Sequence, residues 1–266
     1  MPELPEVERA ARLVRRAAVG KKIAAVKAIH PSLKKKFKPA QARAVKGKRI
    51  ESIERRGKHQ LLHLETGDTL VVHFRMNGDW EVGKTSDPLE RYARAAIELT
   101  DGTRISLVDS RALSSITLDK NGESSLPKLG REASDATLDA DYLIDVLRRK
   151  KIAIKPALMD QSVVAGLGNI YAAEALWEAK IDPRCPAAKV SRAKLEALVE
   201  AIRLVLSPKK RRPGRYTQTR GVDRFAVYDR EGKECRRGDG TIERIVQAGR
   251  STYFCPSCQT DQRPPS

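Results

Sequence analysis

The chain has 266 residues, and its 52 Lys plus Arg against 34 Asp plus Glu give a formal net charge of +18 at pH 7. Such a charge attracts polyanions, of which nucleic acid is the commonest, although a generally basic surface or an acidic protein partner is the alternative. An apolar run of the ~18 residues that span a bilayer and a basic, apolar signal peptide are both missing, so we expect a soluble, intracellular protein without a membrane partner.

The first predicted helix lies in the opening MPELPEVERA. Pro5 suits the first helical position, and Glu6 and Glu8 suit the first turn, where the positive end of the helix dipole favours acids. Apolar residues follow at helical spacing: Val7, Ala10, Ala11, Val14 and Ala18. This account leaves Pro2 and Glu3 unexplained, because both precede the predicted helix.

Residues 48–108 read mainly as strands. Residues 61–64 and 70–74 flank the turn Glu65-Thr-Gly-Asp68, and residues 97–99 and 105–107 flank Thr100-Asp-Gly-Thr103, which is a hairpin signal. We expect Ile97 and Leu99 to face Ile105 and Leu107. The pattern predicts antiparallel sheets packed on each other with the first helix alongside, followed by a turn-rich linker at residues 121–138.

The second half has a helical period. Residues 142–147 form a short amphipathic helix, and Ser191 can cap a longer one with a stripe of Leu195, Leu198, Val199, Ile202 and Leu206. Between them, Gly166-Leu-Gly168-Asn169 is expected to break one helix and open the next. Free amides at that helix start suit a phosphate, although a tight helix–helix turn is an equal alternative. The basic run at residues 209–212 is expected to be a solvated loop close to nucleic acid.

The four cysteines are too few for a disulfide scaffold. Cys255-Pro-Ser-Cys258 is a CxxC knuckle, and Cys235 lies 20 residues before Cys255, so these three can hold zinc. The position that should pair with Cys235 is Gly238, which leaves Asp239 or a water as the fourth ligand. The alternative is a weakly bound or absent metal, with the hairpin packed instead by Val227, Tyr228, Tyr253 and Phe254.

Four motifs together resemble the bacterial formamidopyrimidine-DNA glycosylase family and its endonuclease VIII relatives: PELPEVE at the start, RRGKHQLLHL at 55–64, MDQSVVAGLGNIYAAEAL at 159–176 and GRSTYFCPSCQ at 249–259. The resemblance implies an α+β fold. An N-terminal antiparallel β-sandwich domain with an N-terminal helix (1–120) would precede the linker (121–138), a helix-two-turn-helix DNA-binding domain (139–222) and a zinc-finger-like β-hairpin (223–266).

The resemblance also implies an activity: a monomeric base-excision-repair enzyme of the bacterial cytosol and nucleoid, acting on damaged double-stranded DNA. Removal of Met1 would make Pro2 a nucleophilic N-terminal amine, whose pKa near 7.7 to 8.0 leaves much of it neutral at cellular pH. Attack on the sugar C1′ would expel the base and form an iminium ion, and β- and δ-elimination would cut the strand. Glu3 matches the general acid, and Glu6 is a second carboxylate in the same pocket.

Further residues match the DNA contacts of the family. Phosphate clamps correspond to Lys58, Asn169 and Arg250, which fix the register without reading sequence. Lys155 resembles a lysine near the base pocket, although a simple helix-end charge is the alternative. Enzymes that rotate a nucleotide out of the duplex must fill the gap, and the void-filling residues correspond to Met76, Arg111 and Leu113.

Three departures from the family pattern fall on recognition elements. Within Asp109-Ser-Arg-Ala-Leu-Ser114, Leu113 stands where the family usually has phenylalanine and Ala112 replaces an arginine. Residues 213–225 are shorter than the loop that covers a flipped 8-oxoguanine, which is more like the endonuclease VIII branch and its oxidised pyrimidines. With the missing finger cysteine, these departures predict retained chemistry and a shifted substrate. The alternatives are a catalytically weak relative that binds lesions, abasic sites or bent DNA, and a zinc-ribbon protein that binds RNA or ribosomes.

Overall fold

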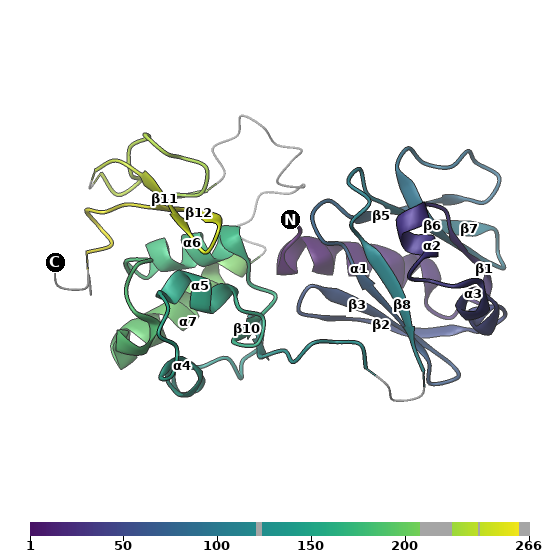
Figure 1. The fold of residues 1–266 in the computed structure, drawn as a ribbon, viewed down its shortest axis with the longest axis horizontal. Coiled ribbons are helices and arrows are strands. Elements are labelled where there is room, and N and C mark those ends of the chain that lie inside the picture. Colours follow the sequence, from purple (N-terminus) through teal and green to yellow (C-terminus); the bar gives the residue numbers. More distant parts are fainter. Residues whose placement is uncertain (121–123, 208–224, 239, 261–266) are drawn as a thin grey trace. The chain divides into compact units, whose positions relative to one another are not determined.

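The computed structural model describes residues 1–120, 124–207, 225–238 and 240–260 (Figure 1). The chain forms two compact units, Met1–Pro127 and Lys128–Ser266. Within the described ranges, every helix is too short or too polar to cross a membrane. The basic run at 209–212, almost all of the short loop at 213–225, and Asp239 lie outside the described residues.

Helix α1 (Leu4–Ala18) begins one residue earlier than we predict, with Glu3 at the N-cap. The reason is local: the Glu3 backbone N–H donates to Glu6 Oε2 at 3.1 Å, so the glutamate at the third helical position satisfies an amide at the helix start. The predicted apolar stripe is confirmed, since the buried residues of α1 are Leu4, Pro5, Val7, Ala10, Ala11, Val14 and Ala18.

The first unit contains two four-stranded antiparallel sheets, ordered β1-β6-β7-β5 and β2-β3-β4-β8. Their strands are β1 (Ile23–Ala28), β2 (Ile50–Arg56), β3 (His59–Leu64), β4 (Thr69–His73), β5 (Asp79–Lys84), β6 (Ala93–Leu99), β7 (Thr103–Val108) and β8 (Ser115–Asp119). Two short helices, α2 (Pro31–Lys34) and α3 (Pro39–Val45), lie between β1 and β2. One apolar core, mostly aliphatic but including Phe37, Phe74 and Trp80, joins both sheets and α1, which makes the expected β-sandwich.

Both predicted hairpins form, but one register differs from the prediction. Ile97 does face Ile105, whereas Leu107 faces Ala95 and Leu99 pairs with Ile23 on β1. In an antiparallel hairpin, a residue one position farther from the turn on one strand pairs with the residue one position farther from the turn on the other strand. Once Ile97 faces Ile105, Leu99 therefore cannot also face Leu107.

The second unit is mainly helical and ends in a β-hairpin. Its helices are α4 (Ala140–Leu147), α5 (Ile154–Met159), α6 (Asn169–Glu178), the 3₁₀ turn η1 (Ala187–Lys189) and α7 (Arg192–Leu206); its strands are β9 (Arg131–Glu132), β10 (Val164–Ala165), β11 (Glu243–Gln247) and β12 (Arg250–Phe254). The helices predicted at 142–147 and after Ser191 are confirmed. Ser191 occupies the N-cap, but its side chain makes no capping hydrogen bond. The predicted domain boundaries stay predictions.

The glycine segment opens α6 but does not break the preceding helix, because α5 already ends at Met159. Gln161 holds the connecting chain: its Nε2 donates to the Leu167 carbonyl at 2.8 Å, and its Oε1 accepts from the Gly166 amide at 2.9 Å. Asn169 is the first residue of α6. The prediction was therefore wrong about the helix break and right about the helix start.

Candidate functional site

The amino terminus of α1 places a proline and two acids together. Pro2 is half-buried and directly precedes Glu3, whose side chain and backbone are only 2% exposed. Glu6 is half-buried, and its Oε2 accepts a hydrogen bond from the backbone N–H of Glu3. An N-terminal amine at Pro2 therefore lies next to a carboxyl group that is shielded from bulk water.

Lys58 lies in the two-residue turn between β2 and β3. Gly57 has φ +58° while Lys58 does not have a positive φ, and a positive φ at only the first central residue is the pattern of a type II′ hairpin turn. Lys58 is 6% exposed. The turn thus holds a buried cation at the end of a rigid hairpin.

Arg55, which the sequence analysis did not single out, connects this turn to α1. Its Nε donates to Glu8 Oε2 at 3.1 Å, and its Nη1 donates to the Gly57 carbonyl at 3.1 Å. One guanidinium therefore joins the Lys58 turn to Glu8, which lies in the second turn of α1 and not in the first turn that we predict for it. The RRGKH motif contained Arg55, but sequence spacing did not reveal its partner Glu8.

Two histidines beside Lys58 were also missed. His59 and His73 face each other across β3 and β4, with ring centroids 4.5 Å apart. Burial, followed by the charges of His59, Arg75 and Lys58, lowers the pKa of His73 from 6.5 to about 3. Burial and Arg75 also lower the pKa of His59. Both rings are therefore neutral at pH 7.

This pair predicts a pH-dependent stability. The unfolded chain takes up a proton on His73 as the pH falls through 6.5, whereas the folded chain does so only near 3, so protonation favours unfolding in that window. Between pH 7.5 and 5.5 the wild-type protein should lose about 1 kcal/mol more stability than His73→Gln. Urea unfolding of both proteins at the two pH values measures this difference. Parallel losses in the two proteins would contradict the assignment.

The loop at 109–114 is organised by one buried carboxylate. Asp109 is 1% exposed; its Oδ1 accepts from the Arg111 amide at 2.9 Å, and its Oδ2 accepts from the amides of Leu113 and Ser114 at 2.7 and 2.8 Å. The side chains of Arg111 and Leu113 remain exposed. The loop therefore presents a cation and an apolar side chain from a fixed backbone.

A second turn lies against this loop. Asn77 Nδ2 donates to Ser110 Oγ at 2.9 Å, which places the half-buried Met76, in the turn between β4 and β5, next to the loop at 109–114. The structure thus brings the predicted residues Met76, Arg111 and Leu113 into one region of the first unit.

In the second unit, Lys155 is the centre of a buried hydrogen-bond cluster. It is 0% exposed, and its Nζ donates to Asn169 Oδ1 at 2.5 Å, the Ser251 carbonyl at 3.0 Å and Thr252 Oγ1 at 2.8 Å. Asn169 Nδ2 donates to the same Ser251 carbonyl at 3.0 Å. Lys155 on α5 therefore ties the start of α6 to strand β12.

Arg250 is the first residue of β12 and lies beside the turn of the β11–β12 hairpin. Ala248 and Gly249 have φ +47° and +71°, and Gln247 pairs with Arg250, which is the pattern of a two-residue type I′ turn. Arg250 is exposed and precedes Ser251. The cluster around Ser251 thus fixes Asn169 and Arg250 on neighbouring positions of one surface.

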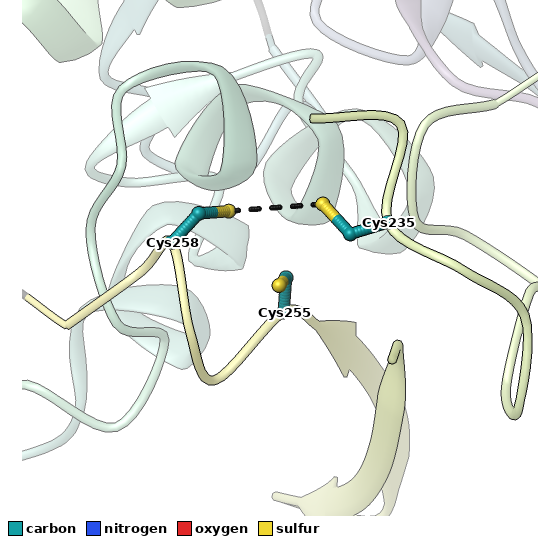
Figure 2. Close-up of side chains that lie close together, drawn as sticks. All are labelled: Cys235, Cys255 and Cys258. Atoms are coloured by element: carbon teal, nitrogen blue, oxygen red, sulfur yellow. Dashed lines mark hydrogen bonds between the residues drawn. The ribbon is translucent and has the colours of Figure 1, made fainter. Parts of the chain in front are cut away.

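Three cysteines converge beside α6 (Figure 2). The Sγ atoms of Cys235, Cys255 and Cys258 all lie within 4.8 Å of one another, with 3.9 Å between Cys235 and Cys258. Four sulfurs around a tetrahedral zinc, each about 2.3 Å from the metal, are about 3.8 Å apart. Burial raises the pKa of Cys258 to about 12 against the hydrogen bond from Arg237, and a bound cation would reverse that shift.

The segment around these cysteines also has its own apolar core. Trp177 and Ala173 of α6 pack against Val227, Ile242 and Cys255, and Tyr228 and Tyr253 meet edge to face at 5.1 Å. Apolar packing therefore supports this segment in addition to any metal that the three cysteines would hold.

Comparison with known proteins identifies the chain. Its residues 1–116, 129–218 and 232–260 match the models of the formamidopyrimidine-DNA glycosylase N-terminal domain, the formamidopyrimidine-DNA glycosylase H2TH domain and the zinc finger found in FPG and IleRS. The chain belongs to the formamidopyrimidine-DNA glycosylase family. It is thus an enzyme of the class of DNA glycosylases with abasic-site lyase activity, as the four motifs indicated.

The alignments with related proteins span almost the whole of this glycosylase. The formamidopyrimidine-DNA glycosylase of Chloroflexus aurantiacus is 38% identical over 100% of both chains, and that of Ruegeria pomeroyi is 36% identical over 97% of this chain and 100% of its own. A structure of MutM in complex with DNA containing carbocyclic 8-oxo-G has a TM-score of 0.88 at 30% identity, covering 98% and 100%. The Lactococcus lactis enzyme bound to DNA containing an AP site has a TM-score of 0.87 at 30% identity, covering 97% and 100%.

The zinc-finger match includes all three clustered cysteines, and their geometry fits zinc. Bound there, zinc would cross-link the turn after β12 to the segment before β11. Gly238 has open space where a side chain would begin, and the fourth ligand that we predict at Asp239 lies outside the described residues. Cys185 is buried elsewhere in the unit, with its Sγ 3.6 Å from the Pro186 carbonyl.

Zinc analysis of the purified glycosylase tests this site. We expect one zinc per chain, retained in Cys185→Ala and lost in Cys255→Ala, with a lower melting temperature in the second variant because metal binding contributes to folding. Elemental analysis and thermal unfolding of the three proteins provide the measurement. Equal zinc content in both variants would contradict the three-cysteine site.

Glu174 on α6 is a further residue that the sequence analysis missed. Its carboxylate accepts from the amides of Ala226, Val227 and Tyr228 at 2.7, 2.9 and 2.9 Å. Burial raises its pKa, against those three donors. Glu174 thereby anchors the segment that leads into the zinc finger of the glycosylase.

Proposed function

We propose that this enzyme is a bifunctional DNA glycosylase and abasic-site lyase of base excision repair, which removes oxidised bases through an N-terminal proline Schiff base followed by β,δ-elimination. The observation that carries the proposal is the placement of Pro2 directly beside the buried carboxyl of Glu3 at the start of α1. Damaged double-stranded DNA is the partner, as in the structures of the relatives, and the bacterial cytoplasm is the site of action.

The chemistry follows from the first three residues. After Met1 is removed, the Pro2 nitrogen attacks the sugar C1′, and the bond to the base breaks with its electron pair leaving on the base. Glu3 supplies the proton that opens the sugar ring, and a cationic iminium forms because the amine is secondary. The cation acidifies the C2′ proton, whose removal expels the 3′ phosphate, and a second elimination expels the 5′ phosphate. Glu6 is the second carboxylate available to this site.

DNA binding is divided between the two units. In the first, Lys58 holds a phosphate, and Met76, Arg111 and Leu113 fill the gap left by the rotated nucleotide. In the second, Asn169 and Arg250 hold phosphates.

Lys155 acts as a positioning residue in this scheme. Its three protein acceptors support a role in orienting Asn169 and the Arg250 hairpin. This role places Lys155 behind the phosphate-binding surface, because its side chain is fully buried.

The substrate has shifted away from 8-oxoguanine and formamidopyrimidine, toward the oxidised pyrimidines of the endonuclease VIII branch. Leu113, 42% exposed on the loop at 109–114, offers an apolar wedge without the stacking of an aromatic ring. A catalytically weak relative that binds lesions or abasic sites is the second candidate, and the retained Pro2 and Glu3 argue against it, because a protein that only binds DNA does not need Pro2 as its N-terminus.

Borohydride trapping separates the two candidates. The protein, with Met1 removal confirmed by mass, is reacted with duplexes that carry 8-oxoguanine, a formamidopyrimidine, an oxidised pyrimidine or an abasic site. We expect a covalent adduct that is absent in Pro2→Gly, strongest with the oxidised pyrimidine and the abasic site. Binding of abasic DNA without an adduct, despite a free Pro2, would favour the lesion-binding relative.

A further inference from the structure

Trp177, next to the last residue of α6, lies against the cysteine cluster. It is 8% exposed, and its indole Nε1 donates to Cys235 Sγ at 3.4 Å. An indole N–H can only donate, and a buried one needs an acceptor. The Trp177 side chain therefore packs in the apolar core of this segment and directs its single donor at one of the three clustered sulfurs.

Arg237 approaches the same cluster from two positions after Cys235. Its Nη1 donates to the Trp177 carbonyl at 2.7 Å and to Cys258 Sγ at 3.5 Å, and its Nη2 donates to the Glu178 carbonyl at 3.1 Å. The guanidinium carbon is 3.7 Å from the centroid of the Trp177 ring. The indole face and the carbonyls at the end of α6 thus hold the guanidinium in one orientation, with its charge beside Cys258.

The charge of this arrangement suits a site with three thiolates. Zinc bound by three thiolates carries one excess negative charge, whereas a fourth thiolate would add a second. Gly238 stands where a fourth cysteine would pair with Cys235. The half-buried Arg237 supplies one fixed positive charge, which balances the three-thiolate complex.

We propose that Trp177 and Arg237 are positioning residues of the metal site, which orient the thiolates of Cys235 and Cys258 through N–H···S hydrogen bonds. They would allow a finger without the fourth cysteine to bind zinc tightly, because donors to metal ligands orient those ligands and strengthen metal binding. The inference concerns the zinc finger alone and does not depend on the chemistry proposed for Pro2.

Zinc affinity measured by competition with a chromophoric chelator tests the proposal. Arg237→Gln should bind zinc about 10- to 100-fold more weakly than wild type, and Trp177→Phe, which keeps an aromatic ring and loses only the indole donor, about tenfold more weakly. Lys233→Gln is the matched control, since it removes one positive charge from an exposed position of the same segment. Its affinity should stay within about twofold of wild type, because solvent screens an exposed charge.

Cobalt(II) substitution separates metal positioning from a merely structural role. At saturating cobalt, the absorption bands of the thiolate-bound ion should shift in Arg237→Gln and Trp177→Phe and should match wild type in Lys233→Gln. A role limited to capping α6 would lower the melting temperature of Arg237→Gln and leave these bands unchanged. That result, wild-type zinc affinity in both variants, or a wild-type protein that takes up neither metal would overturn the proposal.

Discussion

Replacement of Glu3 by glutamine should reduce base excision by about 10²- to 10⁴-fold, the usual contribution of a positioned general acid. The amide keeps the size and hydrogen-bonding capacity of the carboxyl but cannot donate an acidic proton. Because Glu3 is 2% exposed and its backbone N–H is held by Glu6, the start of α1 should remain intact. Single-turnover excision from a lesion-containing duplex measures the loss.

Glu8→Gln is the matched control, since Glu8 belongs to the same helix and pairs with Arg55 and Arg12. The pair with Arg12 is largely exposed on the arginine side and contributes little to stability, and a glutamine at position 8 keeps a side-chain oxygen that can accept from Arg55 Nε, so the Lys58 turn should stay in place. We therefore expect less than a tenfold decrease in excision for this variant. Wild-type excision by Glu3→Gln would remove Glu3 from the mechanism, and an equal loss in both variants would assign the effect to the charge of the helix start.

Replacement of Lys155 by alanine should destabilise the second unit by about 3 kcal/mol. The substitution removes a buried ammonium group and leaves Asn169 Oδ1 and Thr252 Oγ1 without the lysine donor, while the Ser251 carbonyl retains the hydrogen bond from Asn169 Nδ2. Buried acceptors that lose a charged donor keep their desolvation penalty, which makes the effect large. Loss of the constraint on Asn169 should also weaken binding to abasic DNA about tenfold. Urea unfolding and DNA titration provide the two measurements.

Lys150→Ala is the control for this variant. Lys150 also makes a 2.8 Å salt bridge, to Asp160, but its side chain is 32% exposed. An exposed pair of this kind contributes about 0 to 1 kcal/mol. If Lys155→Ala were no more destabilising than Lys150→Ala, Lys155 would not organise the cluster. Lower stability with unchanged DNA affinity would limit its role to folding.

Local patterns in the sequence predicted the elements whose stability depends on near neighbours. The stripe of α1, the turns at 65–68 and 100–103 and the helix after Ser191 are each determined by residues within a few positions of one another. The same locality explains the errors. The capping contact of Glu6 moved the start of α1 by one residue, and strand geometry altered the register of Leu99.

The motifs also identified the family, because a proline before an acid and a CxxC knuckle carry their chemistry in adjacent positions. Only the tertiary structure decided which distant groups meet. Lys155 contacts Thr252 across 97 positions, His59 faces His73 across a hairpin, and Asp109 joins the Tyr92 backbone to Leu113. Periodicity reports which face of an element is buried, whereas these contacts depend on how the sheets and helices pack.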